Sequence, residues 1–367
     1  MKIVSLDVHA ETSQLCVQDE GGQVLLEMQV ATRAEELRRV IGGIPGPKSV
    51  VFEEGPMSGM ISDAVRDLVD EVISCEPSHN ALIARAEDSN DERDARRLGQ
   101  LARLRAVRPV YVPQEPCRGL RSLLVYDLGL AGQVAEVRNK IKGLCRRNGI
   151  PCAGARTYGD RGRARVLAEL SPAAMGWQME SLYRLLDALE AERRSTSKRI
   201  NSLAKKAGPV ERLCTIPGVG PVVARTLVGW IAEPQRFRSR SALCSYAGLG
   251  LGQGWTNWQP VGPARASRRG NRCVKRALFL AARAAIRGRN ALARRYQARR
   301  QEGWEDRKAI RDVARVILKT AVGLWRKGTA YDDAAVSVPR ASTPEGVGMP
   351  TQKAAQGRRI EGGRPRR

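Results

Sequence analysis

Four acidic residues stand where two apolar segments end and where a helix is expected to begin, and carboxylates in such places can hold metal ions. Asp7 and Glu53 each close an apolar run typical of a core strand, while Asp91 and Asp94 are spaced to point the same way from one helical turn. Four carboxylates at one place repel one another unless divalent cations lie between them, and Mg²⁺ prefers such oxygen ligands. Two metal ions can activate the attacking oxygen and stabilise the leaving oxygen of a phosphodiester. These residues therefore predict magnesium-dependent phosphodiester chemistry.

Each of these acids also has a simpler structural explanation. The run Ser89-Asn90-Asp91-Glu92 fits a capping box, in which an acid complements the positive end of a helix. Asp7 can close a turn, and Glu54 is as close to the turn as Glu53. His9 follows Asp7 on the same strand face, where it either supports the site or is a surface histidine.

A second set of residues is suited to binding nucleic-acid phosphates. Gly218 and Gly220 precede an apolar helix expected at 222–231, and such a turn exposes backbone N–H groups, as in helix-hairpin-helix modules. Residues 250–263 are rich in Gly, Trp and Gln and are expected to form a site loop. An arginine-dense helix is expected beyond residue 274, with phosphate contacts from Arg283, Arg287, Arg289, Arg294 and Arg295. The predicted nucleic-acid-binding residues are Gly218, Gly220, Arg268, Arg269, Asn271, Lys275 and Arg276.

The elements around the acidic residues predict an α/β domain. Period-two segments at 3–8, 14–17 and 24–30 predict a three-strand meander, and further strands are expected at 49–52 and 72–75. Helices are expected at 34–41, at 61–68 and from Asp91. A meander followed by alternating helices and strands is typical of a ribonuclease-H-like fold.

Beyond this domain the sequence predicts mostly helices. Apolar stripes across 115–205 indicate an antiparallel helical pair or a coiled-coil arm that dimerises. The next region is basic and mainly helical, and the Pro-, Gly- and Arg-rich end is expected to be disordered. The predicted domains are therefore 1–112, 113–207, 208–330 and a basic tail at 331–367.

The charge distribution favours a polyanionic partner. The 367 residues carry a formal net charge of +25, yet residues 1–100 hold 19 acidic and 10 basic residues, so the remainder has a net charge of +34. A basic region of this size attracts nucleic-acid phosphates. No apolar run approaches the about 20 residues needed to cross a bilayer, and no signal peptide is evident. The eight cysteines form no CxxC pair, so we expect a soluble cytoplasmic protein with reduced thiols and no membrane partner.

Several short motifs, in this order and spacing, resemble the DEDD-type transposases of the insertion sequence 110 family over about residues 1–330. The motifs are Ser5-Leu6-Asp7-Val8-His9, Glu53-Glu54-Gly55-Pro56, Asp91-Glu92-Arg93-Asp94-Ala95, Ile216-Pro217-Gly218-Val219-Gly220-Pro221, Arg236-Phe237-Arg238-Ser239, Tyr246-Ala247-Gly248-Leu249 and Arg269-Gly270-Asn271. The resemblance implies a RuvC-like N-terminal domain that binds Mg²⁺ through Asp7, Glu53, Asp91 and Asp94. It also implies a helical arm, a C-terminal transposase domain with a serine nucleophile, a structured guide RNA and a homo-oligomeric complex on DNA.

The sequence departs from this family pattern at the nucleophile. The segment 250–265, where the family serine is expected, contains no serine, and Thr256 is the nearest hydroxyl residue. Thr256 is therefore the candidate nucleophile of a transposase that forms a covalent protein–DNA link. Two alternatives stay open: a RuvC-like junction-resolving nuclease that uses activated water, and an inactive remnant that binds nucleic acid.

Overall fold

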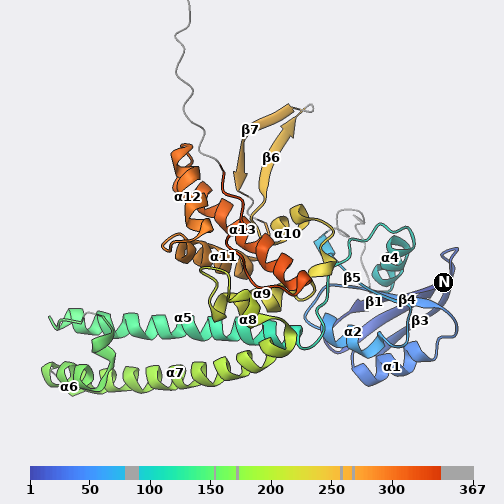
Figure 1. Cartoon of the computed structure of the whole chain (residues 1–367). Helices are drawn as coiled ribbons and strands as arrows, with labels where there is room; N and C mark the ends of the chain where they lie inside the picture. The colour runs from blue at the N-terminus through green and yellow to red at the C-terminus, as the bar shows by residue number, and fades with distance from the viewer. Residues whose placement is uncertain (79–90, 153, 171–172, 257–258, 267–268, 340–367) are drawn as a thin grey trace, which may run out of the picture.

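The computed structural model describes residues 1–78, 91–152, 154–170, 173–256, 259–266 and 269–339, with the backbone alone described at 155, 173, 251–256 and 259–266. A sheet domain, a long helical arm and a C-terminal helical region follow one another along the chain (Figure 1). Among the described residues, none of the helices has both the length and the apolar character that crossing a membrane requires.

The N-terminal domain is built on a five-stranded sheet in the order β3-β2-β1-β4-β5. β1, β2 and β3 form the predicted antiparallel meander, while β4 and β5 run parallel to β1. The strands are β1 (Lys2–Val8), β2 (Thr12–Gln18), β3 (Val24–Ala31), β4 (Lys48–Glu53) and β5 (Glu71–Cys75). Both the meander and the parallel pairing that follows it agree with the predicted ribonuclease-H-like layout.

Helices cover both faces of this sheet (Figure 1). α1 (Ala34–Gly42) and α2 (Ser58–Val65) pack on one face, where Leu6 and Phe52 are fully buried. α4 (Asp91–Arg103) packs on the other face, against β1 and β2, with Leu98 in a smaller apolar cluster. α2 begins and ends three residues earlier than predicted.

Two long helices form the arm. α5 (Cys117–Arg147) and α7 (Ala173–Ala207) lie side by side and antiparallel, with η1 (Ala155–Tyr158) and α6 (Asp160–Glu169) at the outer end (Figure 1). The predicted antiparallel pair is present; supercoiling and dimerisation of this arm stay predictions, as do the predicted domain boundaries.

The C-terminal region packs α9 and α13 on α11 around a large apolar core that includes Leu227, Leu278 and Ile317. Its elements are α8 (Val210–Leu213), α9 (Pro221–Ile231), η2 (Pro234–Arg236), α10 (Arg240–Tyr246), β6 (Leu251–Thr256), β7 (Gln259–Ala266), α11 (Arg272–Ala285), α12 (Ala291–Gln301) and α13 (Asp306–Lys327).

Three predictions for this region were wrong. The segment expected to be a loop at 250–263 forms most of the antiparallel hairpin β6–β7. Two strands pair through backbone hydrogen bonds, so they can form without the alternation of apolar and polar side chains that marks a strand in the sequence. The arginine-dense helix is two helices, since Asn290 caps the start of α12. Residues 331–337 are not a disordered tail: the Tyr331 N–H donates to Thr215 Oγ1, and the Ser337 carbonyl accepts from Arg295. Residues 340–367 lie outside the described part of the chain.

The linker between α4 and α5 contacts both the N-terminal sheet and the C-terminal helical region. The Val110 N–H donates to the Ser74 carbonyl, which adds the linker to the edge of β5. One residue later, the Tyr111 hydroxyl donates to Glu233, and the Arg236 guanidinium lies 4.3 Å from the Tyr111 ring centroid. The linker therefore contacts both the sheet domain and the C-terminal region.

Candidate functional site

Strand register brings Asp7 and Glu53 to the same edge of the sheet. β1 and β4 are parallel, and Leu6 is paired with Phe52, one residue before each acid. Leu6 and Phe52 point toward α1 and α2, so alternation directs Asp7 and Glu53 to the face that α4 covers. The same alternation separates Glu53 from Glu54, which lies just past the strand end.

α4 begins beside this edge because its middle approaches the sheet closely. A Cβ on Gly99 would lie 2.6 Å from Gln18 Oε1 and 3.0 Å from Ser5 Oγ, distances that only glycine tolerates without a shift of the neighbours. This contact seats the helix over β1 and β2, and its first turn carries Asp91 and Asp94. Asp94 also lies 3.4 Å from the Arg97 guanidinium.

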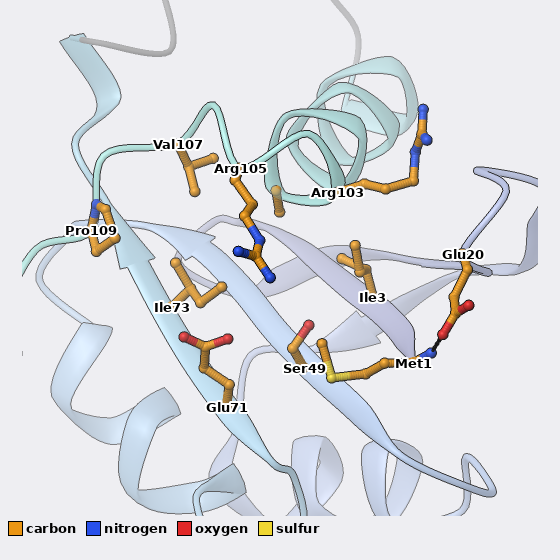
Figure 2. A pocket seen from close by; sticks show the side chains of 11 residues that line it. Met1, Ile3, Glu20, Ser49, Glu71, Ile73, Arg103, Arg105, Val107 and Pro109 are labelled. Atoms are coloured by element: carbon orange, nitrogen blue, oxygen red, sulfur yellow. Dashed lines mark hydrogen bonds and ion pairs between the residues drawn. The ribbon is translucent and has the colours of Figure 1, made fainter.

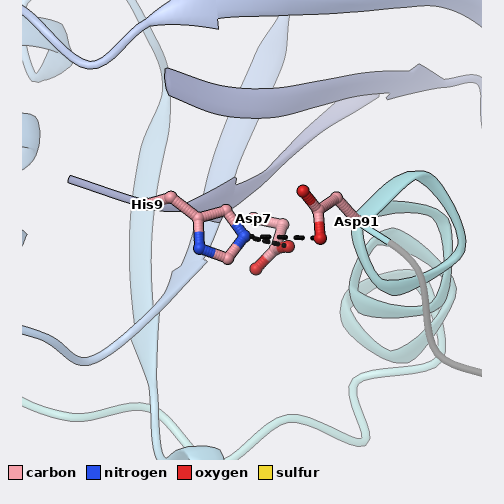
Figure 3. Close-up of side chains that lie close together, drawn as sticks. All are labelled: Asp7, His9 and Asp91. Carbon is pink, nitrogen blue, oxygen red and sulfur yellow. Dashed lines mark hydrogen bonds and ion pairs between the residues drawn. The ribbon is translucent and has the colours of Figure 1, made fainter. Parts of the chain in front are cut away.

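His9 contacts two of the carboxylates (Figure 3). Its Nε2 atom is 3.1 Å from Asp7 Oδ2 and 3.5 Å from Asp91 Oδ1. The three ligand atoms of Asp7, His9 and Asp91 lie within 4.8 Å of one another. A single histidine has no periodic pattern, so its role could not be predicted beyond its position two residues after Asp7 on one strand face.

The electrostatic environment of Asp7 disfavours its charged form. Burial raises the pKa of Asp7, the charge and hydrogen bond of His9 oppose this rise, and the charges of Asp91 and Asp94 add to it. Asp94 is thus close enough to Asp7 to affect its ionisation. A carboxyl whose pKa is raised by the charges of neighbouring acids is one whose charged form a bound cation would stabilise.

The donor set fits a divalent cation. Carboxylate oxygens from Asp7 and Asp91 are suitable for Mg²⁺, and the exposed Glu53 and half-exposed Asp94 lie on the neighbouring strand and in the same helical turn. An imidazole is a better ligand for softer metals, so His9 suits a hydrogen bond to the carboxylates more than a bond to Mg²⁺.

The two glycines of the predicted phosphate turn have different surroundings. Gly218 has φ +81°, and a Cβ there would lie 2.2 Å from the Ala281 carbonyl oxygen, so this turn packs directly on the backbone of α11. Gly220 is exposed, with nothing within 4 Å of its Cβ position, and it precedes the first turn of α9. Gly218 is explained by packing, whereas the Cβ position of Gly220 faces open space.

The predicted residues around α11 also divide between packing and surface positions. The Asn271 side-chain oxygen accepts the Val274 N–H and caps α11, so this atom has a structural role. Lys275 is half-buried beside Gly248, while Arg269 and Arg276 are exposed. Arg268 lies outside the described residues.

Ion pairs occupy two of the arginines expected to contact phosphate. Arg294 pairs with Asp333, and Arg295 pairs with Asp312 in a contact where both side chains are less than one-fifth exposed. Arg295 thus joins α12 to α13, Arg294 joins α12 to the segment after α13, and their contacts with phosphate stay a prediction.

Thr256 is the last residue of β6, at the outer end of the hairpin. In Figure 1 this end projects away from the N-terminal sheet, so Thr256 and the acidic edge of the same chain lie far apart. A single copy of the chain does not bring the candidate nucleophile to the carboxylates.

A cavity of about 690 Å³ lies on the α4 face at the opposite end of the sheet (Figure 2). It is lined by residues near the starts of the parallel strands, such as Ile3, Ser49 and Glu71, and Arg105 reaches into it. Asp7 and Glu53 lie at the other ends of β1 and β4, so this cavity is separate from the acidic site.

Comparison with known proteins decides the family. The profile of the DEDD transposases of IS110 matches residues 4–147, and a profile described as transposase IS116/IS110/IS902 family matches residues 210–297. The chain belongs to the IS110 family of transposases. The first match contains the strand-end acids and the start of α4, and the second contains the glycine turn, the hairpin and α11.

Two curated relatives agree with this assignment. The chain is 32% identical over 154 residues to a protein named insertion element IS110 uncharacterized 43.6 kDa protein from Streptomyces coelicolor, which covers 41% of this chain and 37% of the relative. It is 25% identical over 210 residues to a probable family 20 transposase from Pseudomonas aeruginosa, covering 54% of this chain and 60% of the relative. The matched regions thus span less than two thirds of each relative.

Proposed function

We propose that this protein is a DNA transposase that cleaves and rejoins DNA strands with Mg²⁺ held by Asp7, Glu53, Asp91 and Asp94. The observation that carries the proposal is the group of ligand atoms from β1 and α4 within 4.8 Å of one another, at the sheet edge where β4 also ends. When bound, Mg²⁺ stabilises negative charge on the attacking and leaving oxygens of a phosphodiester.

The chain's own side chains position the acids. His9 Nε2 holds the Asp7 and Asp91 carboxylates at one point, and Arg97 approaches Asp94 from one turn further along α4. The Gly99 contact keeps the helix start at the strand ends. The site is thereby assembled before DNA binds, which lowers the cost of ordering it during the reaction.

The proposed nucleophile is Thr256. Attack of its hydroxyl on phosphorus forms a protein–DNA ester, and the leaving deoxyribose oxygen takes a proton. Because Thr256 and the carboxylates of one chain lie apart, the reaction requires two copies, one supplying the hydroxyl and the other the acidic edge. We propose that the arm formed by α5 and α7 joins these copies in a homo-oligomer. The strongly basic remainder supports a structured guide RNA as a second nucleic-acid partner, as the family resemblance implies.

The strand-cleavage test compares two adjacent glutamates on labelled DNA in Mg²⁺. Glu53→Gln is expected to lower the cleavage rate at least 100-fold, and Glu54→Gln, its matched control, to keep it within about threefold. Asp7→Ala and Asp94→Ala are expected to be as inactive as Glu53→Gln. Full activity in both aspartate variants would remove the proposed metal site.

A junction-resolving nuclease is the second candidate, because residues 250–265 contain no serine. The two reactions differ in their intermediate: a transposase with Thr256 as nucleophile leaves protein attached to DNA after denaturation, whereas hydrolysis by water does not. Thr256→Val is expected to abolish the covalent adduct. Magnesium-dependent cleavage that persists in Thr256→Val would assign the protein to the nuclease class.

A further inference from the structure

A basic cavity lies between α13 and the segment that leads into α10, and its lining includes no residue of the acidic edge, the glycine turn or the hairpin. Its volume is about 320 Å³, and Arg238, Arg240, Lys319 and Lys327 line it together with apolar side chains, with no acidic residue in the lining. With Arg326, five cations surround this cavity and repel one another, so the composition of the cavity favours an anion.

The four cationic side chains are available to a ligand. All four are exposed, and within the described part of the chain none of them takes part in a hydrogen bond or an ion pair. Arg326, by contrast, donates to the Pro234 and Phe237 carbonyls and so fixes the wall of the cavity. This arrangement differs from that of Arg294 and Arg295, whose charges are already paired.

The cavity ends a longer basic row on α13. Positions four residues apart on this helix are Arg307, Arg311, Arg315, Lys319, Gly323 and Lys327, so five of the six are cationic. Residues at i and i+4 are neighbours on a helix surface and are about 6 Å apart along its axis. At Gly323 nothing lies within 4 Å of the Cβ position, which leaves the row open where it meets the cavity.

Two arginines in the middle of the row indicate that the row has an unfilled requirement for an anion. Arg315 Nε is buried without a hydrogen-bond partner. Burial lowers the pKa of Arg311, and the adjacent charge of Arg315 lowers it further. A phosphate oxygen near this pair would supply the opposite charge.

We propose that the cavity and the α13 row form a binding track for the sugar–phosphate backbone of duplex DNA. The cations contact phosphates, and the apolar walls contributed by Phe237, Leu243 and Val322 contact deoxyribose. We commit to duplex DNA because this inference rests on the proposed transposase function, and because the row turns by about 40° at each step around α13, so that its charges wind about the helix axis as the phosphates of a duplex wind about theirs. Contacts of this kind bind without reading base sequence.

A chain of contacts connects the track to the acidic edge. Phe237 lines the cavity, and the preceding Arg236 stacks on the ring of Tyr111. The linker next to Tyr111 pairs with the end of β5, and the Glu54 N–H donates to the Cys75 carbonyl at the same end. DNA held on the track is thereby fixed relative to the sheet edge that carries Glu53.

The test measures binding of full-length protein to a fluorescent 30-base-pair duplex between 50 and 200 mM salt. Lys319→Gln/Lys327→Gln removes two exposed charges from the track. Arg33→Gln/Arg66→Gln removes two exposed charges from the N-terminal domain and is the control with the same net charge. A second track variant, Arg238→Gln/Arg240→Gln, guards against a local effect on α13.

Each lost phosphate contact lowers the slope of log K against log [salt] by about 0.9, so both track variants are expected to lose about 1.8 from the slope. The ratio of the parent's affinity to the variant's affinity is then expected to fall about tenfold between 50 and 200 mM salt. Slopes equal to the parent's, or an equal loss in the control, overturn the proposal. If the track variants lose slope only on duplex RNA of the same sequence, the proposal is also overturned, and the track is assigned to RNA. If the parent itself binds no DNA, the proposed function fails; if the parent binds and the track variants match it, only this inference fails.

Discussion

Replacing Asp7 by asparagine distinguishes two effects of the carboxylates: their mutual repulsion, which destabilises the folded protein, and their binding of Mg²⁺. Asp7 and Asp91 offer ligand atoms within 4.8 Å of each other. Two unit charges at that distance repel by about 3.5 kcal/mol at an effective dielectric constant of about 20, and by about 0.9 kcal/mol in bulk water. The Asp7 side chain is 26% exposed and that of Asp91 is 64% exposed, so a value near the lower limit, about 1 kcal/mol, applies. Because Asp7→Asn also loses its charge interaction with His9, we expect it to be more stable than the parent by at most this amount in a chelator.

In Mg²⁺ the parent is expected to become more stable than Asp7→Asn. An ion present at about 100 times its dissociation constant stabilises the folded parent by about 2.7 kcal/mol, and the gain falls to about 0.4 kcal/mol if the variant binds 100-fold more weakly. Every tryptophan lies at or after residue 177, so fluorescence does not report on this domain. Hydrogen exchange of peptides covering β1 and β4, with EDTA or with Mg²⁺, measures its stability directly.

Asp67→Asn is the control, because Asp67 pairs with Arg38 away from the strand ends and its loss leaves the magnesium response unchanged. Equal protection by Mg²⁺ in the parent and in Asp7→Asn would refute the reasoning, since the ion would then not need this carboxylate. A less stable variant in EDTA would refute the crowding argument.

Two further predictions concern the C-terminal region and are measured by urea unfolding followed by tryptophan fluorescence. Gly218→Ala is expected to lower the free energy of unfolding by about 2–4 kcal/mol, because the new methyl meets a backbone carbonyl at 2.2 Å and φ is positive. Gly220→Ala is the control: its methyl enters open space, and the loss is expected to be less than about 1 kcal/mol. Equal losses would contradict the packing explanation. Asp312→Asn is expected to cost about 2 kcal/mol at pH 7, because it leaves Arg295 and Arg299 without their shared partner. Burial raises the pKa of Asp312, but the hydrogen bonds and charges of the two arginines outweigh it and hold the pKa below its ordinary value. The difference in free energy of unfolding between parent and Asp312→Asn is therefore largest above about pH 5, and it decreases as the pH falls through the lowered pKa of Asp312. A difference that does not change between pH 7 and pH 2 would exclude this linkage.

The sequence predicted the acidic edge because local rules determine it. Asp7 and Glu53 each end an apolar strand, and side-chain alternation assigns both to one face once the strands are parallel. The meander and the parallel strands follow from period-two patterns of the same kind. How closely α4 approaches the sheet was not predictable, because the contact of Gly99 with Gln18 and Ser5 joins residues far apart in the chain. The contact of His9 with Asp91 depends on that approach of α4.

Long-range pairing also explains what was not predicted in the C-terminal region. Arg294 and Arg295 look like a solvated basic face in the sequence, but their partners Asp333 and Asp312 lie 39 and 17 residues away. The hairpin β6–β7 was missed because its glycines and prolines hide the alternation that marks a strand. The basic row on α13 could have been predicted from the four-residue spacing alone.

The linker that runs along β5 limits where the chain can be divided for separate expression. Residues 108–110 supply the backbone partners of Ser74 and Glu76, so a truncated domain that stops at Arg103 would leave that border of the sheet bare. Extending the truncation to Pro113 would restore those partners but expose the ring of Tyr111, which the C-terminal region normally shelters. Either product is expected to self-associate, so biochemical work on the metal site is best done with the intact polypeptide.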